Sequence, residues 1–458
     1  MVKCFIVYAD DLKGILSPLF FSSQPKNTKG FVELNKIAEI NPSRKINNIS
    51  LNDLVSYVGL PETGDLEIKR ILKRPYKEVK GRNIIKKGDI LFARIEPSIF
   101  NKKYIFIDDL QDNDYALTST EFYIVKAKEN VNPRFLFYML FTKDVYAQVR
   151  GRTTGSTGRR RLDKGVFENL LIPYPDTKIQ THIVELMDNA YEIKNQKETE
   201  AQQLLDSIDD YVLEELGIKL PELKDEMCYV IWGDDVKNNR CDAYYYQPKF
   251  EEVEEAIKRG TYETKKFNEV AKQLINGLDF RKFSEDGLTY IRVSNINPNS
   301  INNEEVRYIS PINISKKIHL ESGNLLITRK GTFGVAAVVE KNHEEFIISS
   351  EIFKIELEQE LVNPFFISTW MNSYAQKIIF DRIKTGGIMG HISQEALSNI
   401  IIPLPSLQIQ NKIANEVKAR MQKAEQLQKE AKEVLEEAKE RVERIILGEE
   451  EDRIQNED

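Results

Sequence analysis

The chain has 458 residues, of which 30% are charged, and a formal net charge of −7. It has no run of 18 or more apolar residues, so no membrane span is predicted, and its start lacks the pattern of a signal peptide. The three cysteines are scattered, which argues against a disulfide framework and against a zinc site. We therefore expect a cytoplasmic protein with reduced thiols.

Charge is distributed unevenly along the chain. The stretch from Lys69 to Lys103 holds twelve basic residues against three acidic ones, a balance of +9. The stretch from Asp176 to Glu226 holds five lysines against fourteen acidic residues, a balance of −9. This asymmetry bears on binding partners more than the net charge does. A DNA-binding surface and a merely solvated surface account for the basic run about equally well.

Short strands are predicted in the first globular segment, residues 1–175, because apolar runs alternate there with turn residues. They are Ile84–Ile85, Ile90–Arg94, Tyr104–Ile107 and Glu121–Val125. A helix is expected to begin at Pro133, directly after the capping residue Asn132.

The same order of features returns 230 residues later. Asn169–Pro175 reappears as Asn399–Pro405, and Val131–Phe135 reappears as Val362–Phe366. The strands predicted in this second copy are Tyr290–Val293, Leu325–Thr328, Val335–Val339 and Ile347–Ile355. A period this long indicates a duplicated domain rather than a solenoid. Two similar domains that carry different loops can recognise two different targets at a fixed separation.

A long helix is predicted after each copy. The second one, residues 406–447, carries a heptad stripe that includes Val417, Ala424, Leu427, Ala431, Val434 and Ala438. The first one, residues 176–217, carries a weaker stripe that includes Ile183, Leu186, Ile193, Leu204 and Ile208. Sustained heptads favour a coiled coil, and the simplest packing places the two helices antiparallel.

The predicted fold class is therefore mixed α/β (α+β). Two duplicated globular domains are separated by two long antiparallel coiled-coil helices, with pseudo-two-fold symmetry. The expected boundaries are 1–175, 176–217, a linker at 218–240, 241–405, 406–447 and an acidic, disordered tail at 448–458.

Patterns typical of catalysis are weak in this sequence. No glycine-rich phosphate loop ending in Gly-Lys-Ser/Thr is present, and the four histidines lack metal-ligand spacing. Asn363–Phe366 approaches a methyltransferase motif but lacks its second proline, so a helix cap accounts for it better. Asp176 with Glu192 and Lys194 mimics a nuclease pattern, but the last two fall on the solvated face of a predicted helix. We expect no active site, no bound metal and no enzyme activity in this chain.

DNA-binding chemistry is better represented. The loop from Arg150 to Arg161 combines glycines, hydroxyl groups and arginines, which suit phosphate and guanine contacts. It has a counterpart from Lys384 to His391, although a mobile surface loop is the alternative. The residues expected to bind DNA are Arg94, Arg150, Arg152, Thr154, Ser156, Thr157, Arg159 and Arg160 in the first copy, and Arg329, Lys330, Thr332, Lys384, Gly387 and His391 in the second.

Together these features resemble the specificity subunit of Type I restriction-modification systems. The resemblance rests on Ile172–Gln180 and Ile402–Gln410, on Gly155–Gly158, on Tyr290–Val293 and on Arg240–Tyr245. It covers most of the chain, although Met1–Phe21 resemble Asp242–Pro248 only faintly.

The resemblance implies two target recognition domains that select a split, asymmetric site on double-stranded DNA. It also implies two methyltransferase subunits that bind S-adenosylmethionine and dock on the helical regions. Restriction subunits that use ATP and Mg²⁺ join them, with no cofactor on this chain. Two other interpretations stay open: the recognition portion of a fused restriction-methylation enzyme, and a coiled-coil scaffold for protein interactions.

Overall fold

The computed structural model describes residues 30–450 except 65, 67, 102, 112–113, 141, 151, 157–159, 234–235, 237–241, 311–317 and 386–389. The chain divides into two compact units. Unit 1 comprises the described residues up to Lys197 and those from Glu430 onward, and unit 2 comprises those from Glu198 to Lys429.

Unit 1 contains two four-stranded sheets. The first is antiparallel, with the order β2 (Ala38–Ile40), β9 (Phe122–Ala127), β6 (Ile90–Ala93), β7 (Tyr104–Phe106). The second has the order β4 (Leu72–Pro75), β3 (Leu54–Val58), β8 (Ala116–Thr118), β5 (Asn83–Ile85), and its β3–β8 pair is parallel.

Unit 2 repeats this topology, except that its second sheet has no counterpart of β5 among the described residues. Its antiparallel sheet has the order β14 (Ala271–Asn276), β22 (Ile352–Leu357), β19 (Leu325–Thr328), β20 (Ala336–Val338). Its second sheet has the order β18 (Arg307–Ile309), β15 (Leu288–Ile291), β21 (Ile347–Ile348), and its β15–β21 pair is again parallel. A short hairpin joins β16 (Ile296–Asn297) and β17 (Ser300–Ile301).

The segment expected as one strand, Ile347–Ile355, is in fact two strands in different sheets, so that prediction was wrong. A turn closes between them, because Ile352 N donates to Ser349 O at 2.9 Å. Ser349 N donates to Ile291 O at 2.9 Å, which keeps the first part in the sheet of β15. The apolar sequence carried no mark of this change of sheet.

In each unit the first and last strands pair with each other. β1 (Phe31–Glu33) lies antiparallel to β12 (Leu171–Pro173), and β13 (Thr264–Lys266) lies antiparallel to β23 (Ile401–Pro403). The registers correspond, with Phe31 opposite Pro173 and Thr264 opposite Pro403. The chain therefore enters and leaves each globular copy at one place.

Unit 1 has α2 (Leu34–Ile37), α3 (Tyr76–Val79), α4 (Glu96–Phe100), α5 (Pro133–Met139), α6 (Lys143–Val149) and α7 (Lys164–Glu168). Unit 2 has α9 (Pro248–Lys258), α10 (Pro364–Asn372), α11 (Tyr374–Ile383) and α12 (Gln394–Ser398). The last three helices of each globular copy follow the same order: α5, α6 and α7 in unit 1, and α10, α11 and α12 in unit 2. The long helices are α8 (Thr177–Glu215) and α13 (Leu407–Leu447).

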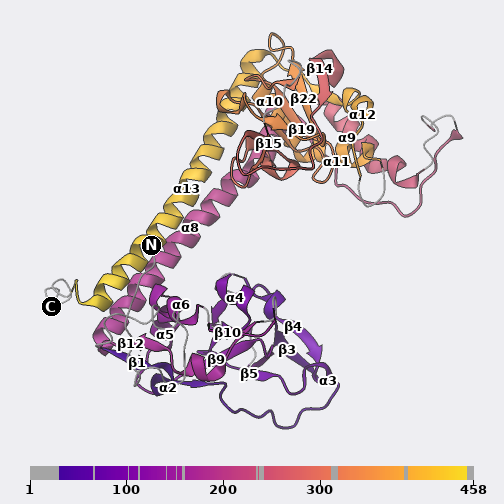
Figure 1. Cartoon of the computed structure of the whole chain (residues 1–458). Coiled ribbons are helices and arrows are strands. Elements are labelled where there is room, and N and C mark those ends of the chain that lie inside the picture. The colour runs from indigo at the N-terminus through magenta and orange to yellow at the C-terminus, as the bar shows by residue number, and fades with distance from the viewer. Residues whose placement is uncertain are drawn as a thin grey trace. The chain divides into compact units, whose positions relative to one another are not determined.

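Alternation along the central strands divides each unit into two cores. On β6, Ile90 and Phe92 pack towards the helices, whereas Leu91 and Ala93 pack towards the second sheet. On β19, Leu325 and Ile327 likewise pack towards the helices, and Leu326 packs on the other side. Successive strand side chains point to opposite faces, so each globular part is a helix layer, a sheet and a second sheet (Figure 1).

A buried glutamine fastens each long helix to its globular part. Gln410 Oε1 accepts from Asn363 N at 2.8 Å, while its Nε2 donates to Pro405 O at 2.8 Å and to Leu361 O at 3.0 Å. Gln180 makes the equivalent bonds in unit 1. Its Oε1 accepts from Asn132 N at 3.4 Å, and its Nε2 donates to Pro175 O at 2.9 Å. These contacts explain why proline, asparagine and glutamine recur together in the two copies.

The long helices pack together in antiparallel register. In unit 1, Lys197 Nζ lies 2.6 Å from a carboxylate oxygen of Glu430. In unit 2, Lys412 pairs with Glu215 at 2.7 Å, and Arg420 donates to the Ser207 carbonyl at 3.0 Å. In each of these pairs the two residue numbers add up to 627. A constant sum is expected where two antiparallel helices keep one register.

The predicted heptad residues lie at this seam to different depths. Ile183, Val417, Ala424, Leu427, Ala431 and Ala438 are buried, while Leu186, Ile193, Leu204, Ile208 and Val434 are partly buried. The structure confirms the predicted fold class: two duplicated mixed α/β domains with two long helices packed together. No helix in the described part of the chain combines the length and the apolarity needed to cross a membrane.

Candidate nucleic-acid interface

One arginine in unit 1 stands at the meeting point of three elements. Arg94 directly follows β6; its backbone N–H donates to Glu121 O at 2.8 Å, and its carbonyl accepts from Leu162 N at 2.8 Å. Its guanidinium lies over the ring of Tyr123, with Cζ 5.0 Å from the ring centroid. The Nε of Arg94 is buried and has no hydrogen-bond partner in the described structure.

An arginine of unit 2 has the same surroundings. Arg329 directly follows β19, donates its N–H to Glu351 O at 2.9 Å and accepts from Ile392 N at 3.0 Å. Its Cζ lies 5.3 Å from the centroid of the Phe353 ring. Its Nε is also buried and unpartnered among the described residues.

Neither guanidinium forms an ion pair with a carboxylate in the described ranges, so their charges are available to a ligand. An arginine stacked on an aromatic ring is held in one orientation at little cost in solvation. Its planar donors suit phosphate oxygens or the O6 and N7 atoms of guanine. The predicted DNA-binding role of Arg94 and Arg329 therefore has a geometry that fits it.

The predicted loops lie next to these arginines in both units. In unit 1, β10 (Thr153–Thr154) pairs with β11 (Arg161–Leu162), and Arg161 also bridges Ile95. In unit 2, His391 bridges both Thr385 and Lys330. The structure thus brings each loop to the end of the strand that carries the stacked arginine.

Several charges of the unit 1 loop are engaged within the protein. Arg160 Nε lies 3.3 Å from a carboxylate oxygen of Glu96, and Arg160 Nη2 donates to Thr153 O at 2.9 Å. Arg161 donates to both carboxylate oxygens of Glu121, at 2.6 and 2.9 Å, and this bond lowers the pKa of Glu121. Arg160 therefore braces the hairpin, and its contact with DNA stays a prediction.

The other predicted residues of this loop differ in exposure. Arg150, Thr154 and Ser156 are exposed. Arg152 is partly buried, and burial lowers the pKa of its guanidinium to about 10. Thr157 and Arg159 lie outside the described residues.

The unit 2 loop has a different chemistry. Lys330 and Thr332 are exposed, and His391 is partly buried with its Nε2 3.4 Å from Thr385 Oγ1. Lys384 forms an ion pair with Asp381. Gly387 lies outside the described residues. This loop offers threonine, lysine and histidine where unit 1 offers mainly arginine.

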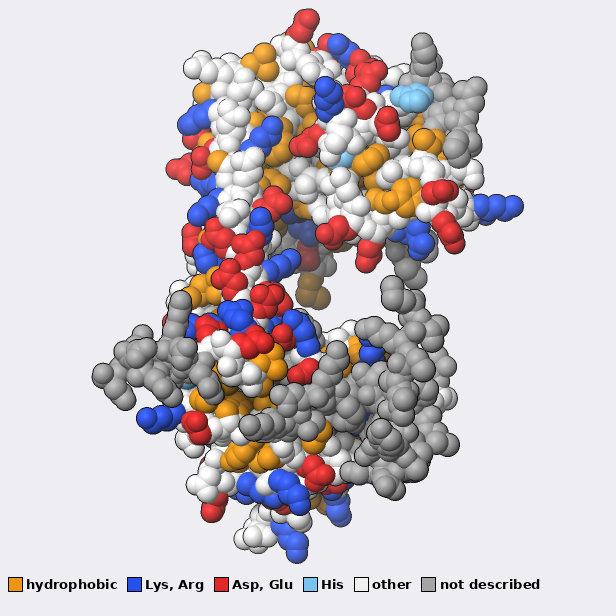
Figure 2. Space-filling model, turned by 60° about the vertical axis from the view of Figure 1, so that its left-hand side comes forward, with side chains coloured by type: hydrophobic (Ala, Val, Ile, Leu, Met, Phe, Trp, Pro, Cys, Tyr) orange, Lys and Arg blue, Asp and Glu red, His pale blue; other side chains and the backbone are white. Residues whose placement is uncertain are grey.

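The basic run of unit 1 is solvent-facing. Lys69, Lys80, Lys86 and Lys87 are exposed and form no ion pair with a described residue. One of the three acidic residues of the run, Asp89, is held by Arg44, which lies outside the run. Figure 2 shows acidic and basic side chains interspersed over the face it presents, so the basic character is local.

Sequence reasoning missed the aromatic partners of the two arginines. Tyr123 and Phe353 each stand two residues after the glutamate whose carbonyl binds the arginine N–H, Glu121 or Glu351. A comparison of the two copies at these positions could have found them, because the spacing is the same in both.

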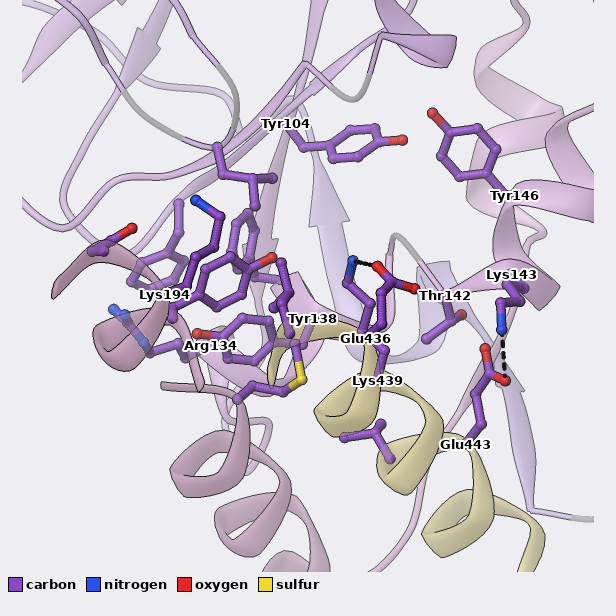
Figure 3. Close-up of a pocket in the computed structure, with 18 of the residues that line it drawn as sticks. Tyr104, Arg134, Tyr138, Thr142, Lys143, Tyr146, Lys194, Glu436, Lys439 and Glu443 are labelled. Carbon is purple, nitrogen blue, oxygen red and sulfur yellow. Dashed lines mark hydrogen bonds and ion pairs between the residues drawn. The ribbon is translucent and has the colours of Figure 1, made fainter. Parts of the chain in front are cut away.

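A cavity of about 720 Å³ in unit 1 lies between α5, α6, α8 and α13, and Arg94 does not line it (Figure 3). Tyr104, Tyr138, Tyr146 and Tyr191 contribute to its lining, and the ion pair between Lys143 and Glu443 lies at it. Of the predicted DNA-binding residues, Arg150 lines it. No three His, Cys, Asp or Glu side chains in the described ranges cluster so that they could hold a metal ion.

The fold and these sites define a class: a duplicated recognition protein whose two like domains carry unlike loops on a paired-helix frame. A family model for the "Type I restriction modification DNA specificity domain" matches residues 25–206 and 259–437, which is most of the chain. The chain therefore belongs to this family and is a Type I specificity subunit, the non-catalytic component of such systems.

Relatives agree with this assignment, and a solved structure shares the fold. The Type I restriction enzyme EcoEI specificity subunit of Escherichia coli is 22% identical, over 87% of this chain and 80% of that subunit. The EcoAI specificity subunit of Escherichia coli is 28% identical, but the match covers 38% of this chain and 30% of that relative. A solved structure concerned with complex assembly and conformational transition of the type I R-M system has a TM-score of 0.53 at 16% identity, covering 91% of this chain and 96% of that one.

Proposed function

We propose that this chain selects a bipartite, asymmetric site on double-stranded DNA, with one half read by each unit. The observation that carries the proposal is the pair of equivalently placed arginines, Arg94 and Arg329. Each is stacked on an aromatic ring, lacks an ion-pair partner among the described residues and adjoins the loop predicted to bind DNA. The same geometry occurs once in each unit, which suits a DNA site that has two halves.

The two halves of the DNA site are expected to differ in sequence. The loop beside Arg94 contributes further arginines, whereas the loop beside Arg329 contributes Thr385 and His391. An arginine side chain binds preferentially to guanine edges, whereas a hydroxyl group can form hydrogen bonds with several different bases. The exposed lysines of the basic run add phosphate contacts that fix position without reading sequence.

The reaction chemistry is assigned to partner subunits. The proposed complex contains two methyltransferase subunits that bind S-adenosylmethionine and restriction subunits that use ATP and Mg²⁺, and it works in the cytoplasm. The relative whose structure concerns complex assembly supports the assembly role. The acidic stretch from Asp176 to Glu226 suits a basic protein surface better than it suits DNA.

A map of methylated bases in the host genome, made with and without this gene, tests the proposal. We expect one split, asymmetric sequence to lose its methylation when the gene is removed. If the purified chain alone methylates or cuts DNA, the fused-enzyme alternative holds instead. If methylation is unchanged and the chain shows no sequence preference with its methyltransferase partner present, the scaffold alternative holds.

A further inference from the structure

A short apolar segment of unit 2 stands in solvent. It runs from Met227 to Trp232 and reads MCYVIW. Met227, Val230 and Trp232 have exposed fractions of 103%, 78% and 73%. Apolar side chains gathered in this way mark a surface that is covered in the working assembly.

The segment has the properties of an unpaired strand. Exposure alternates along it: Cys228, Val230 and Trp232 are exposed, whereas Tyr229 and Ile231 are partly buried. The hydroxyl of Tyr229 donates to the carbonyl of Ala243, which holds the inner face against the protein. No backbone–backbone hydrogen bond joins 227–232 to another described residue.

The start of the segment is anchored by side chains. Gln247 Oε1 accepts from Glu226 N at 3.0 Å, and Gln247 Nε2 donates to Glu226 O at 3.0 Å. Lys249 Nζ lies 2.5 Å from a carboxylate oxygen of Asp225. The segment is thus presented from a fixed point next to η4 (Ala243–Tyr246) and α9.

This sequence is written twice in the chain. Cys228–Lys237 reads CYVIWGDDVK, and Cys4–Lys13 reads CFIVYADDLK. Four of the ten positions are identical, and the others exchange aromatic for aromatic, aliphatic for aliphatic and glycine for alanine. The anchor is repeated as well, since Gln24–Lys26 and Gln247–Lys249 both read QPK. The first copy lies outside the described residues.

The N-terminal stretch therefore matches the residues from Cys228 onward, and its likeness to Asp242–Pro248 alone is faint. The duplication extends upstream of the globular copies, to Cys4 in one case and Cys228 in the other. Met227–Trp232 contributes neither to the sheets nor to the helix seam described above. Because a similar sequence precedes both globular copies, we interpret it as serving one binding task twice.

We propose that Met227–Trp232 is a docking strand for a protein subunit that the complex contains twice, and that Cys4–Lys13 takes the second copy of that subunit. The proposal rests on the proposed function, in which the subunit present twice is the methyltransferase. The segment is rich in β-branched and aromatic residues, and its exposed and inward side chains alternate from Cys228 to Trp232. Such a segment suits addition to the edge of a partner sheet, with pockets for Val230 and Trp232. The two aspartates that follow oppose contact with DNA phosphates.

The test uses the full chain co-expressed with its methyltransferase subunit. Native mass spectrometry and a binding titration follow Val230→Ser/Trp232→Ser, the corresponding Ile6→Ser/Tyr8→Ser, and the four-fold variant. Leu361→Ser, which alters an exposed leucine of unit 2 outside the segment, is the matched control. Each double variant should weaken one of two sites by about 100-fold, as truncation of a buried aromatic anchor does, and the four-fold variant should weaken both.

A second readout reports contact directly. Cys228 is an exposed free thiol, so in a Cys4→Ser/Cys241→Ser chain the bound methyltransferase should slow its alkylation by about tenfold or more if the partner covers the strand. The docking proposal is refuted if the four-fold variant still binds two methyltransferase subunits with full affinity. It is also refuted if Cys228 stays unprotected in the assembled complex. If the wild-type chain binds no methyltransferase subunit, the proposed function itself fails, which is a distinguishable result.

Discussion

Replacement of Arg94 by alanine should weaken binding to one half of the DNA site and leave the other half unaffected. Loss of a bidentate arginine–guanine contact costs about 1–3 kcal/mol, or roughly 5- to 150-fold in affinity. The loss of stability should be smaller, about 0.5–1 kcal/mol for a partly exposed cation–π contact. The ring itself is held independently, because the Tyr123 hydroxyl donates to Leu162 O at 2.7 Å.

The assay is a thermodynamic cycle on three duplexes: the intact site and two versions with one half scrambled. Arg94→Ala should lose its effect when its own half is already scrambled and keep it when the other half is scrambled. Arg329→Ala should show the opposite pattern, and thermal unfolding should report that both variants are folded. Equal effects of Arg94→Ala on both scrambled duplexes would refute the assignment of one arginine to each half.

Three further outcomes are expected. Gln410→Met should destabilise unit 2 by about 2–4 kcal/mol in urea unfolding, since it removes three hydrogen bonds of a buried group. Gln180→Met should destabilise unit 1 less, because Gln180 makes fewer and longer hydrogen bonds. Equal losses of stability in the two variants would contradict this account. Burial lowers the pKa of His343, so the unfolded chain binds the proton more readily and stability should fall as the pH drops below about 6.5; urea midpoints at pH 7.5 and 5 should show a smaller difference for His343→Asn than for the wild type. Lys86→Ala/Lys87→Ala should weaken binding to all sequences alike and make the slope of log K against log salt shallower by about 1–2; a change of sequence preference would show that these lysines do more than contact phosphate.

Much of the fold could be predicted because local signals and tertiary structure agree. Pro133 and Pro364 begin helices behind asparagines whose side chains accept from the next backbone N–H groups, as the sequence indicated. The heptad stripe also predicted the extent of α13, from Leu407 to Leu447. These signals depend on residues close in sequence, which a single chain displays directly.

The candidate site was harder to predict because its meaning depends on neighbours distant in sequence. Arg94 and Arg160 look alike in the sequence, yet one is stacked and without an ion pair in the described structure while the other pairs with Glu96. The role of Gln410 in joining α13 to the cap at Asn363 likewise requires contacts across 47 residues. The upstream duplication, by contrast, is visible in the sequence alone, because Cys4–Lys13 and Cys228–Lys237 match position by position.

The pairing of first and last strands has a consequence for how such proteins diversify. Phe31 lies opposite Pro173, and Thr264 opposite Pro403, so the two ends of each globular insert are separated by about 5 Å, the spacing of neighbouring strands. An entire insert can be exchanged for an unrelated one without altering the junction with the helices, provided that the bordering strands and the glutamine remain. New target preferences can therefore arise by recombination of whole cassettes, rather than by gradual change of single contacts.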